Sequence, residues 1–180
     1  MLKRLRLDAM HERHRALTPS LSGAYREAAA VCLSRHHTPP AQISLSDNGE
    51  DSSAEVAWDV PDARIRDAWA NNTDTTEAGA YACVIAGVEE VRGLVAVRRA
   101  ETGTGADYYV GAPGSGVFDL EDCVRLEVSG VDAGDHRAVA RRLLEKLEQA
   151  GEGRSSLPAL AGVIGFAAGL LVLRDVEDIA

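Results

Sequence analysis

Positive charge is scarce in this sequence, and lysine is almost missing from it. The 28 Asp and Glu residues outnumber the 19 Lys and Arg residues, which leaves a formal net charge of −9. General nucleic-acid binders draw most of their affinity from a strongly basic surface. The composition therefore argues against a general polyanion-binding protein, although it leaves room for a local basic patch. The two lysines are Lys3 and Lys146, which makes Lys146, inside a predicted helix, a residue to follow.

Aromatic residues and cysteines are also few. Aromatics make up 4% of the 180 residues, so aliphatic side chains and alanine must fill the core. The apolar fraction of 46% is that of a globular protein, and the length suits one full core with a small extra lobe. The cysteines at 32, 83 and 123 lack metal-type spacing and lie in apolar stretches. This pattern is typical of buried free thiols in a reducing compartment, so we expect a cytoplasmic protein.

Long apolar runs are limited to one segment. The N-terminal stretch MLKRLRLDAMHERH has no run of signal-peptide length. Residues 155–173 form a stretch of 19 residues without a charge, which approaches the length of a membrane-spanning helix. Pro158 and the turn-like sequence AAG at 167–169 favour two buried strands instead, so we expect no membrane contact. A tail-anchored membrane protein is the alternative that rests on this run alone.

The first part of the chain, residues 1–72, is predicted to be an accessory region. Apolar residues at helical spacing predict a helix over 21–35. Alternating patterns predict strands at 41–47 and 54–60, joined as a β-hairpin by the turn-rich sequence DNGEDSS. A short helix, DARIRDAWA, follows Pro61. The run NNTDTT then predicts a break and the boundary between two regions.

The second part, residues 73–180, is predicted to be an α/β core. Asp74 and Glu77 resemble a capping box that opens a helix ending at Arg92. The expected elements are this helix, three strands at 94–101, 105–111 and 124–130, a helix at 136–150, and strands at 158–166 and 170–176. We therefore expect an α/β (α+β) fold, in which helices flank a mixed central sheet in the order α-β-β-β-α-β-β.

Four residues in this core carry candidate chemistry. Asp107 lies on the second of the three strands, Glu127 lies on the third, and Glu77 opens the first helix. Carboxylates on neighbouring strands, with the backbone carbonyl of Val128, are ligands that suit Mg²⁺. Such a cation activates water and offsets charge on a phosphodiester. A lysine nearby, such as Lys146, would orient the nucleophile or stabilise developing charge.

The element order, with these acids, resembles the PD-(D/E)XK nuclease superfamily over roughly 100 residues of the chain. That resemblance implies a Mg²⁺- or Mn²⁺-dependent phosphodiester hydrolase that acts on DNA, with restriction or phage defence as its setting. It also implies catalytic roles for Asp107, Glu127, Glu77 and a lysine. Ser129 departs from the pattern, because it stands where the superfamily has its lysine. In some members the lysine has moved to the following helix, and Lys146 suits such a move.

Each candidate has a structural alternative. Glu127 fits the solvated face of a strand, and Asp107 fits a turn after the sequence GTG. Glu77 fits a helix cap, and Lys146 fits a side chain whose stem covers apolar surface. A non-catalytic nuclease-like subunit that binds a protein partner in a larger complex is the competing function. The acidic charge and Ser129 favour that alternative.

Several arginines are weaker candidates for a nucleic-acid face: Arg98, Arg99, Arg125, Arg142 and Arg154. Adjacent residues of a strand point to opposite faces. Arg98 and Arg99 therefore cannot both belong to one patch.

Overall fold

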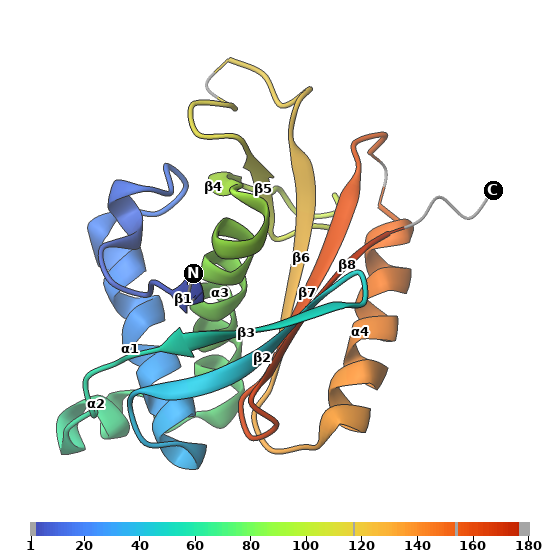
Figure 1. Ribbon diagram of the computed structural model, residues 1–180. Helices are drawn as coiled ribbons and strands as arrows, with labels where there is room; N and C mark the ends of the chain where they lie inside the picture. The colour runs from blue at the N-terminus through green and yellow to red at the C-terminus, as the bar shows by residue number, and fades with distance from the viewer. Residues whose placement is uncertain (1–2, 117, 154, 177–180) are drawn as a thin grey trace.

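The computed structural model describes residues 3–116, 118–153 and 155–176. These residues form an eight-stranded mixed sheet in the order β1-β3-β2-β8-β7-β6-β5-β4, with helices on both faces (Figure 1). The strands are β1 (Lys3–Leu5), β2 (Ala41–Asp47), β3 (Glu50–Val56), β4 (Val95–Arg99), β5 (Tyr108–Gly111), β6 (Val124–Val131), β7 (Ala159–Gly165) and β8 (Leu170–Asp175). The helices are η1 (Met10–Glu12), α1 (Pro19–His36), α2 (Ala63–Ala68), α3 (Asn72–Arg92) and α4 (His136–Gly151).

The predicted order of the C-terminal elements is confirmed. Strands β4, β5 and β6 are antiparallel neighbours, and α4 then crosses over so that β7 pairs parallel to β6. Strand β8 returns antiparallel to β7. The sheet thus changes from antiparallel to parallel at β6, the strand that carries Glu127.

The uncharged run at 155–173 forms β7, a turn and most of β8. Side chains of β7 alternate between two apolar layers, with Leu160 and Ile164 in the main core and Ala161 and Val163 packed against α4. A strand that is covered on both faces has a continuous apolar sequence. Burial of β7 between two layers therefore explains the uncharged run, and no membrane segment is needed. Among the described residues, no helix has both the length and the apolarity required to span a bilayer.

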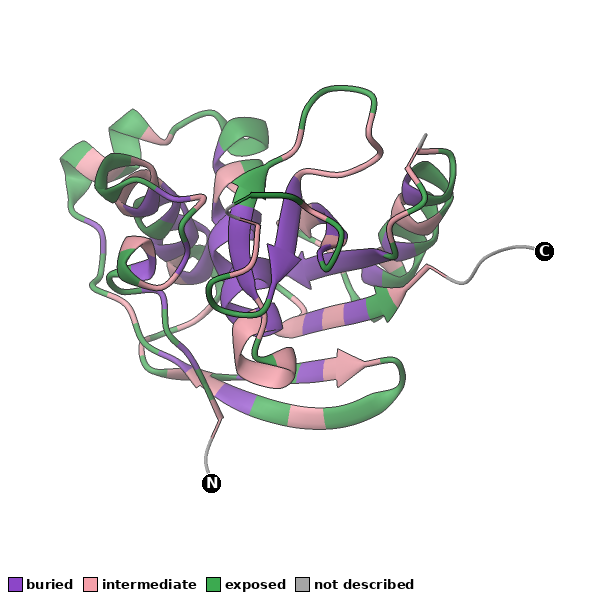
Figure 2. Ribbon diagram, turned by 90° about the horizontal axis from the view of Figure 1, so that it is seen from above, coloured by how far each residue is buried: buried purple, intermediate pink, exposed green. Residues whose placement is uncertain are grey.

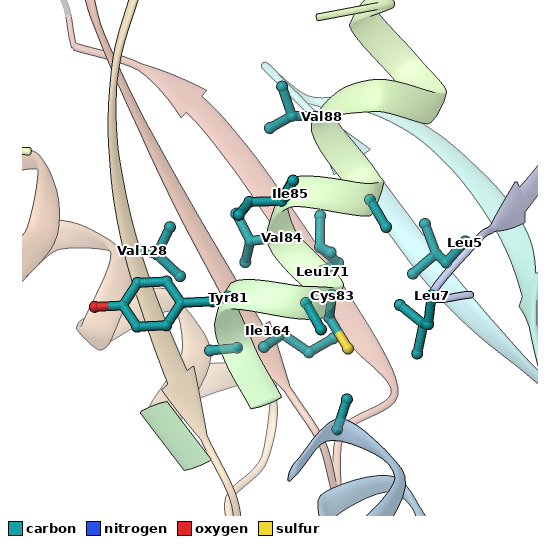
Figure 3. Close-up of a cluster of buried hydrophobic side chains, with 14 of the residues drawn as sticks. Leu5, Leu7, Tyr81, Cys83, Val84, Ile85, Val88, Val128, Ile164 and Leu171 are labelled. Carbon is teal, nitrogen blue, oxygen red and sulfur yellow. The ribbon is translucent and has the colours of Figure 1, made fainter. Parts of the chain in front are cut away.

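The main core lies between the sheet and the pair α1 and α3. Burial is concentrated in the central strands and the inner sides of the helices (Figure 2). Figure 3 shows Val84, Ile85 and Val88 of α3 packed near the sheet, with Tyr81 on the same helix beside Val128 of β6. The hydroxyl of Tyr81 points away from this apolar cluster, toward the candidate site.

Helix α3 begins earlier than the sequence pattern indicated. Its N-cap is Asn71, whose side chain accepts hydrogen bonds from the backbone N–H groups of Thr73 and Asp74. The capping box of Asp74 and Glu77 is therefore wrong, and the NNTDTT run starts a helix where a break was expected. Gly93, at φ 66°, ends the helix in the left-handed conformation that glycine adopts readily.

The predicted β-hairpin is confirmed, but its second strand begins earlier in the sequence than predicted. Asn48 and Gly49 both have positive φ, 50° and 86°, so they form a two-residue turn directly after β2. Strand β3 therefore occupies Glu50–Val56, where the predicted strand was 54–60. The hairpin joins the sheet of the core, because β2 pairs in parallel with β8.

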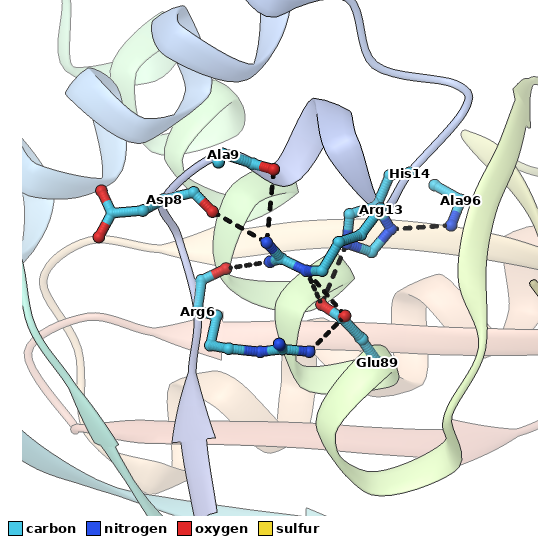
Figure 4. Close-up of polar contacts among 7 residues, drawn as sticks. All are labelled: Arg6, Asp8, Ala9, Arg13, His14, Glu89 and Ala96. Atoms are coloured by element: carbon cyan, nitrogen blue, oxygen red, sulfur yellow. Dashed lines mark hydrogen bonds and ion pairs between the residues drawn. The ribbon is translucent and has the colours of Figure 1, made fainter.

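The N-terminal segment is attached through a polar cluster around Glu89 of α3 (Figure 4). Arg6 and Arg13 place guanidinium nitrogens 2.6 and 2.8 Å from Glu89 Oε1. The ring of His14 is fully buried, with Nε2 at 3.2 Å from Glu89 Oε2. Its Nδ1 accepts a hydrogen bond of 3.0 Å from the Ala96 N–H, which fixes the neutral tautomer with the proton on Nε2.

Candidate functional site

The candidate site lies where strands β5 and β6 part. Pairing between them runs from Val110 with Val124 to Tyr108 with Leu126, and β6 then continues to Val131 with β7 alone. Asp107 directly precedes β5, and its N–H donates to the Leu126 carbonyl at 2.8 Å. Beyond Leu126, no described strand pairs with β6 on its β5 side, so this edge of β6 faces the cleft.

The side chain of Asp107 pairs with Val128, the first residue of that open edge whose backbone N–H has no partner in a described strand. Its Oδ2 accepts a 2.8 Å hydrogen bond from the Val128 N–H, and its Oδ1 lies 2.9 Å from the Tyr81 hydroxyl. These partners lie on β6 and α3, so a role in the turn before β5 does not account for the contacts of the Asp107 side chain. The Val128 carbonyl faces the same edge, since the N–H and C=O of a strand residue point the same way.

Glu127 is buried, with 4% of its surface exposed. Its Oε1 accepts a 2.7 Å hydrogen bond from Lys146 Nζ. Burial, the largest influence, raises the pKa of Glu127; the Lys146 bond opposes this rise and the charge of Asp107 adds to it. The solvated-face alternative for Glu127 is therefore wrong, because a solvated carboxylate would not be enclosed and paired.

Lys146 extends from α4 to the acid on β6. Besides Glu127, its Nζ donates to Gln149 Oε1 at 2.9 Å on the same helix. The side chain is 17% exposed, so its ammonium lies within the cleft wall and not in bulk solvent. Of the two alternatives for Lys146, the structure shows the one in which its ammonium reaches a site carboxylate, that of Glu127.

Glu77 lies in the second turn of α3, on the cleft. Its Oε1 is 3.1 Å from the Tyr81 hydroxyl one helical turn later. Since Asn71 caps the helix, capping does not explain Glu77.

Tyr81 was not predicted from the sequence, and Arg99 was considered only as part of a nucleic-acid face, not as a neighbour of the acid pair. The Arg99 guanidinium lies 4.6 Å from the ring centroid of Tyr81 and 4.7 Å from that of Tyr108. Its Nη2 donates to the Tyr81 hydroxyl at 3.0 Å and lies 3.6 Å from Asp107 Oδ1. Burial and the Asp107 charge raise the pKa of Tyr81, so the hydroxyl keeps its proton at neutral pH. The only sequence signal was a tyrosine one turn after Glu77.

The predicted site residues line one cleft of about 540 Å³. Its walls are the first turns of α3, the open edge of β6 and the side of α4 that carries Arg142, Lys146 and Gln149. The residues around it that matter for chemistry are Glu77, Tyr81, Asp107, Glu127, Val128, Ser129, Arg142 and Lys146. Asp107 and Glu127 are thus on the same cleft, as the nuclease hypothesis requires.

The donors suit a hard divalent cation that keeps much of its water. Among the described residues, no three His, Cys, Asp or Glu side chains gather into a ready-made metal group. The candidate ligands on the open side of the sheet are the carboxylates of Asp107 and Glu127 and the carbonyl of Val128, while Glu77 faces them from α3. Mg²⁺ is commonly held by one or two carboxylates with water completing its shell. Glu127 Oε2 has no hydrogen-bond partner within the described part of the chain, which leaves it available as a ligand.

The other arginines do not form one basic face. Arg125 is buried and donates to the backbone carbonyls of Leu157, Thr104 and Ala150, so it holds loops together. Arg98 pairs with Glu101. Arg142 lines the cleft and pairs with Glu145, 3.0 Å away. Arg154 lies outside the described residues.

Comparison with known proteins identified no relative of this chain. A scan against protein-family models and searches of curated proteins and of solved structures found no match to this chain.

Proposed function

We propose that this chain is a metal-dependent, nuclease-like protein that acts on DNA, with restriction or phage defence as its setting. One observation carries the proposal. Asp107, directly before β5, Glu127 on the neighbouring β6, and Lys146 on the crossover helix line one cleft where the sheet opens. An acid pair with a lysine at an opened sheet edge suits phosphodiester hydrolysis.

The topology gives independent support. From α3 to β7 the element order is helix, three antiparallel strands, crossover helix and a parallel strand, which resembles the PD-(D/E)XK core. Lys146 supports the idea of a displaced lysine, because it bonds to Glu127 although Ser129 holds the usual position. Fold resemblance alone does not establish activity, so the site carries the proposal.

Each residue has a role that follows from its place. Asp107, Glu127 Oε2 and the Val128 carbonyl would hold Mg²⁺ or Mn²⁺, which neutralises phosphate charge and lowers the pKa of bound water. Lys146 orients Glu127 and supplies positive charge at the cleft wall. Glu77, exposed on α3, is an auxiliary acid that faces the cleft from the opposite side. Cleft water and the substrate phosphate meet between these groups.

The test is DNA cleavage by the full chain. Plasmid and linear DNA are incubated with the protein and Mg²⁺ or Mn²⁺, and products are resolved on gels. Asp107→Asn should reduce cleavage by about 100-fold or more, as loss of a group acting on the transition state does. Asp51→Asn is the matched control, because β3 is separated from β6 by three strands. Cleavage that Asp107→Asn leaves unchanged would overturn the proposed site.

A non-catalytic subunit remains the second candidate, favoured by Ser129 and by the lack of a ready-made metal group among the described residues. On that hypothesis the cleft binds a segment of a partner protein. Absence of DNA and RNA hydrolysis with every divalent cation tried, by protein shown to be folded, would favour it over the first.

A further inference from the structure

The Tyr81 hydroxyl is shared among three charged groups. It accepts from Arg99 Nη2 at 3.0 Å and lies 3.1 Å from Glu77 Oε1 and 2.9 Å from Asp107 Oδ1. A hydroxyl has one proton, so it donates to one carboxylate at a time. Tyr81 thus connects the acid on α3 with the acid beside β6.

Arg99 is held close to Asp107 without a direct hydrogen bond to it. Its Nη2 is 3.6 Å from Asp107 Oδ1, whereas a charge-assisted bond of this kind is usually about 2.7–2.9 Å. The guanidinium instead lies over the rings of Tyr81 and Tyr108 and donates to the Tyr81 oxygen. The phenol therefore accepts the hydrogen bond of the same Arg99 nitrogen that lies 3.6 Å from the carboxylate.

The position of the phenol is fixed by packing. Tyr81 is 5% exposed, and its ring centroid lies 5.1 Å from that of Tyr25 and 5.6 Å from that of Tyr108. The hydroxyls of Tyr25 and Tyr108 are joined by a 2.8 Å hydrogen bond. Three of the four tyrosines in this aromatic-poor chain thus pack together beside Asp107.

We propose that Tyr81 is a positioning residue that keeps Arg99 from hydrogen-bonding directly to Asp107, so that Asp107 stays available to a divalent cation. The inference rests on the proposed function. Without the hydroxyl, Arg99 Nη2 loses its acceptor, and Asp107 Oδ1 is the nearest charged replacement. The present 3.6 Å ion pair would then become a direct Arg99–Asp107 hydrogen bond, which would compete with the cation for the same oxygen.

The experiment is a double-mutant cycle read by Mn²⁺ binding, measured by isothermal titration calorimetry on the full chain. Tyr81→Phe keeps the ring and removes the hydroxyl. It should weaken Mn²⁺ binding about tenfold, the size of one hydrogen bond to a charged group. In the Arg99→Met background, where no guanidinium can move onto Asp107, the same change should have little effect. Tyr109→Phe, at a buried tyrosine of a separate cluster, should bind like the wild type.

The outcomes separate this inference from the proposed function. If Tyr81→Phe weakens Mn²⁺ binding equally in both backgrounds, or not at all, Tyr81 does not restrain Arg99 and the inference is overturned. If the wild type binds no Mn²⁺, or binds it equally well after Asp107→Asn, the proposed metal site fails and this inference fails with it. Thermal unfolding of each variant confirms that the binding measurements refer to folded protein.

Discussion

At the scale of single residues, the Lys146–Glu127 pair links the stability of the protein to its candidate site. Lys146→Met keeps an unbranched stem but leaves Glu127 Oε1 buried without its donor. We expect the free energy of unfolding at about pH 7 to fall by about 1–3 kcal/mol, the cost of a buried group that loses its partner. Urea unfolding measures this change. Adding Glu127→Gln should recover most of it, because no buried charge then remains.

The size of this loss should depend on pH. The pKa of Glu127 is already raised from 4.5 by burial, and removing the Lys146 bond raises it further. Between the unfolded and folded pKa values the folded variant holds a proton that the unfolded chain has released, so its stability falls as the pH rises. Lys146→Met should therefore be less destabilising at about pH 5 than at about pH 7. An equal loss at both pH values would contradict the assigned ion pair.

Asp107 and Glu127 were selected through the resemblance of the element order to a nuclease core, and helix phase then placed Lys146 beside the apolar side of its helix. Tyr81 and Arg99 could not be found in this way. The register of β4 with β5 shifts between Ala96 and Arg98, so parity along β4 does not predict the direction of Arg99. Stacking of a guanidinium on two rings from other elements is a tertiary contact without a local sequence signal.

At the scale of elements, helix and strand types followed from the sequence more reliably than their ends did. Residues 71–76 offer several capping side chains in succession, and the choice of Asn71 depends on where α3 packs. The hairpin was misplaced because a seven-residue connector was inferred from composition. The Asn48–Gly49 pair alone closes the turn, which is the stronger short-range signal.

The contact of the N-terminal segment with α3 and β4 should weaken in acid. Burial, the largest influence, lowers the pKa of His14 from 6.5, although Glu89 opposes the shift. Below about pH 6.5 the unfolded chain gains a proton that folded His14 cannot accept without losing the Ala96 bond, so stability falls as the pH falls. Urea unfolding at about pH 7.5 and 5.5 should show a smaller decrease for His14→Gln than for the wild type. Equal decreases would mean that another group causes the acid sensitivity.

At the scale of the whole molecule, the sequence left open how residues 1–72 meet the rest. Their pairing with β8 joins Ser44 to Leu170 and Asp47 to Leu173, across most of the chain. No local pattern specifies a partner at such a separation, since register depends on which faces become buried. Arg92 strengthens this junction through Asp47 and through Asp175, which lies 2.6 Å away. The main core also draws residues from both regions, including Leu33, Ile43, Val84 and Ile164.

A shared sheet and a shared core predict one cooperative unfolding transition. Both tryptophans, Trp58 and Trp69, lie in the N-terminal region and donate hydrogen bonds to Ser34 and Glu27 of α1, so their fluorescence reports on residues 1–72. Far-UV circular dichroism reports mainly on α1, α3 and α4. The two signals should give the same urea midpoint, because separating β2 from β8 would expose the apolar surface of both regions at once. An earlier fluorescence midpoint would instead show that residues 1–72 unfold as a separate lobe, with the candidate cleft intact in the remaining core.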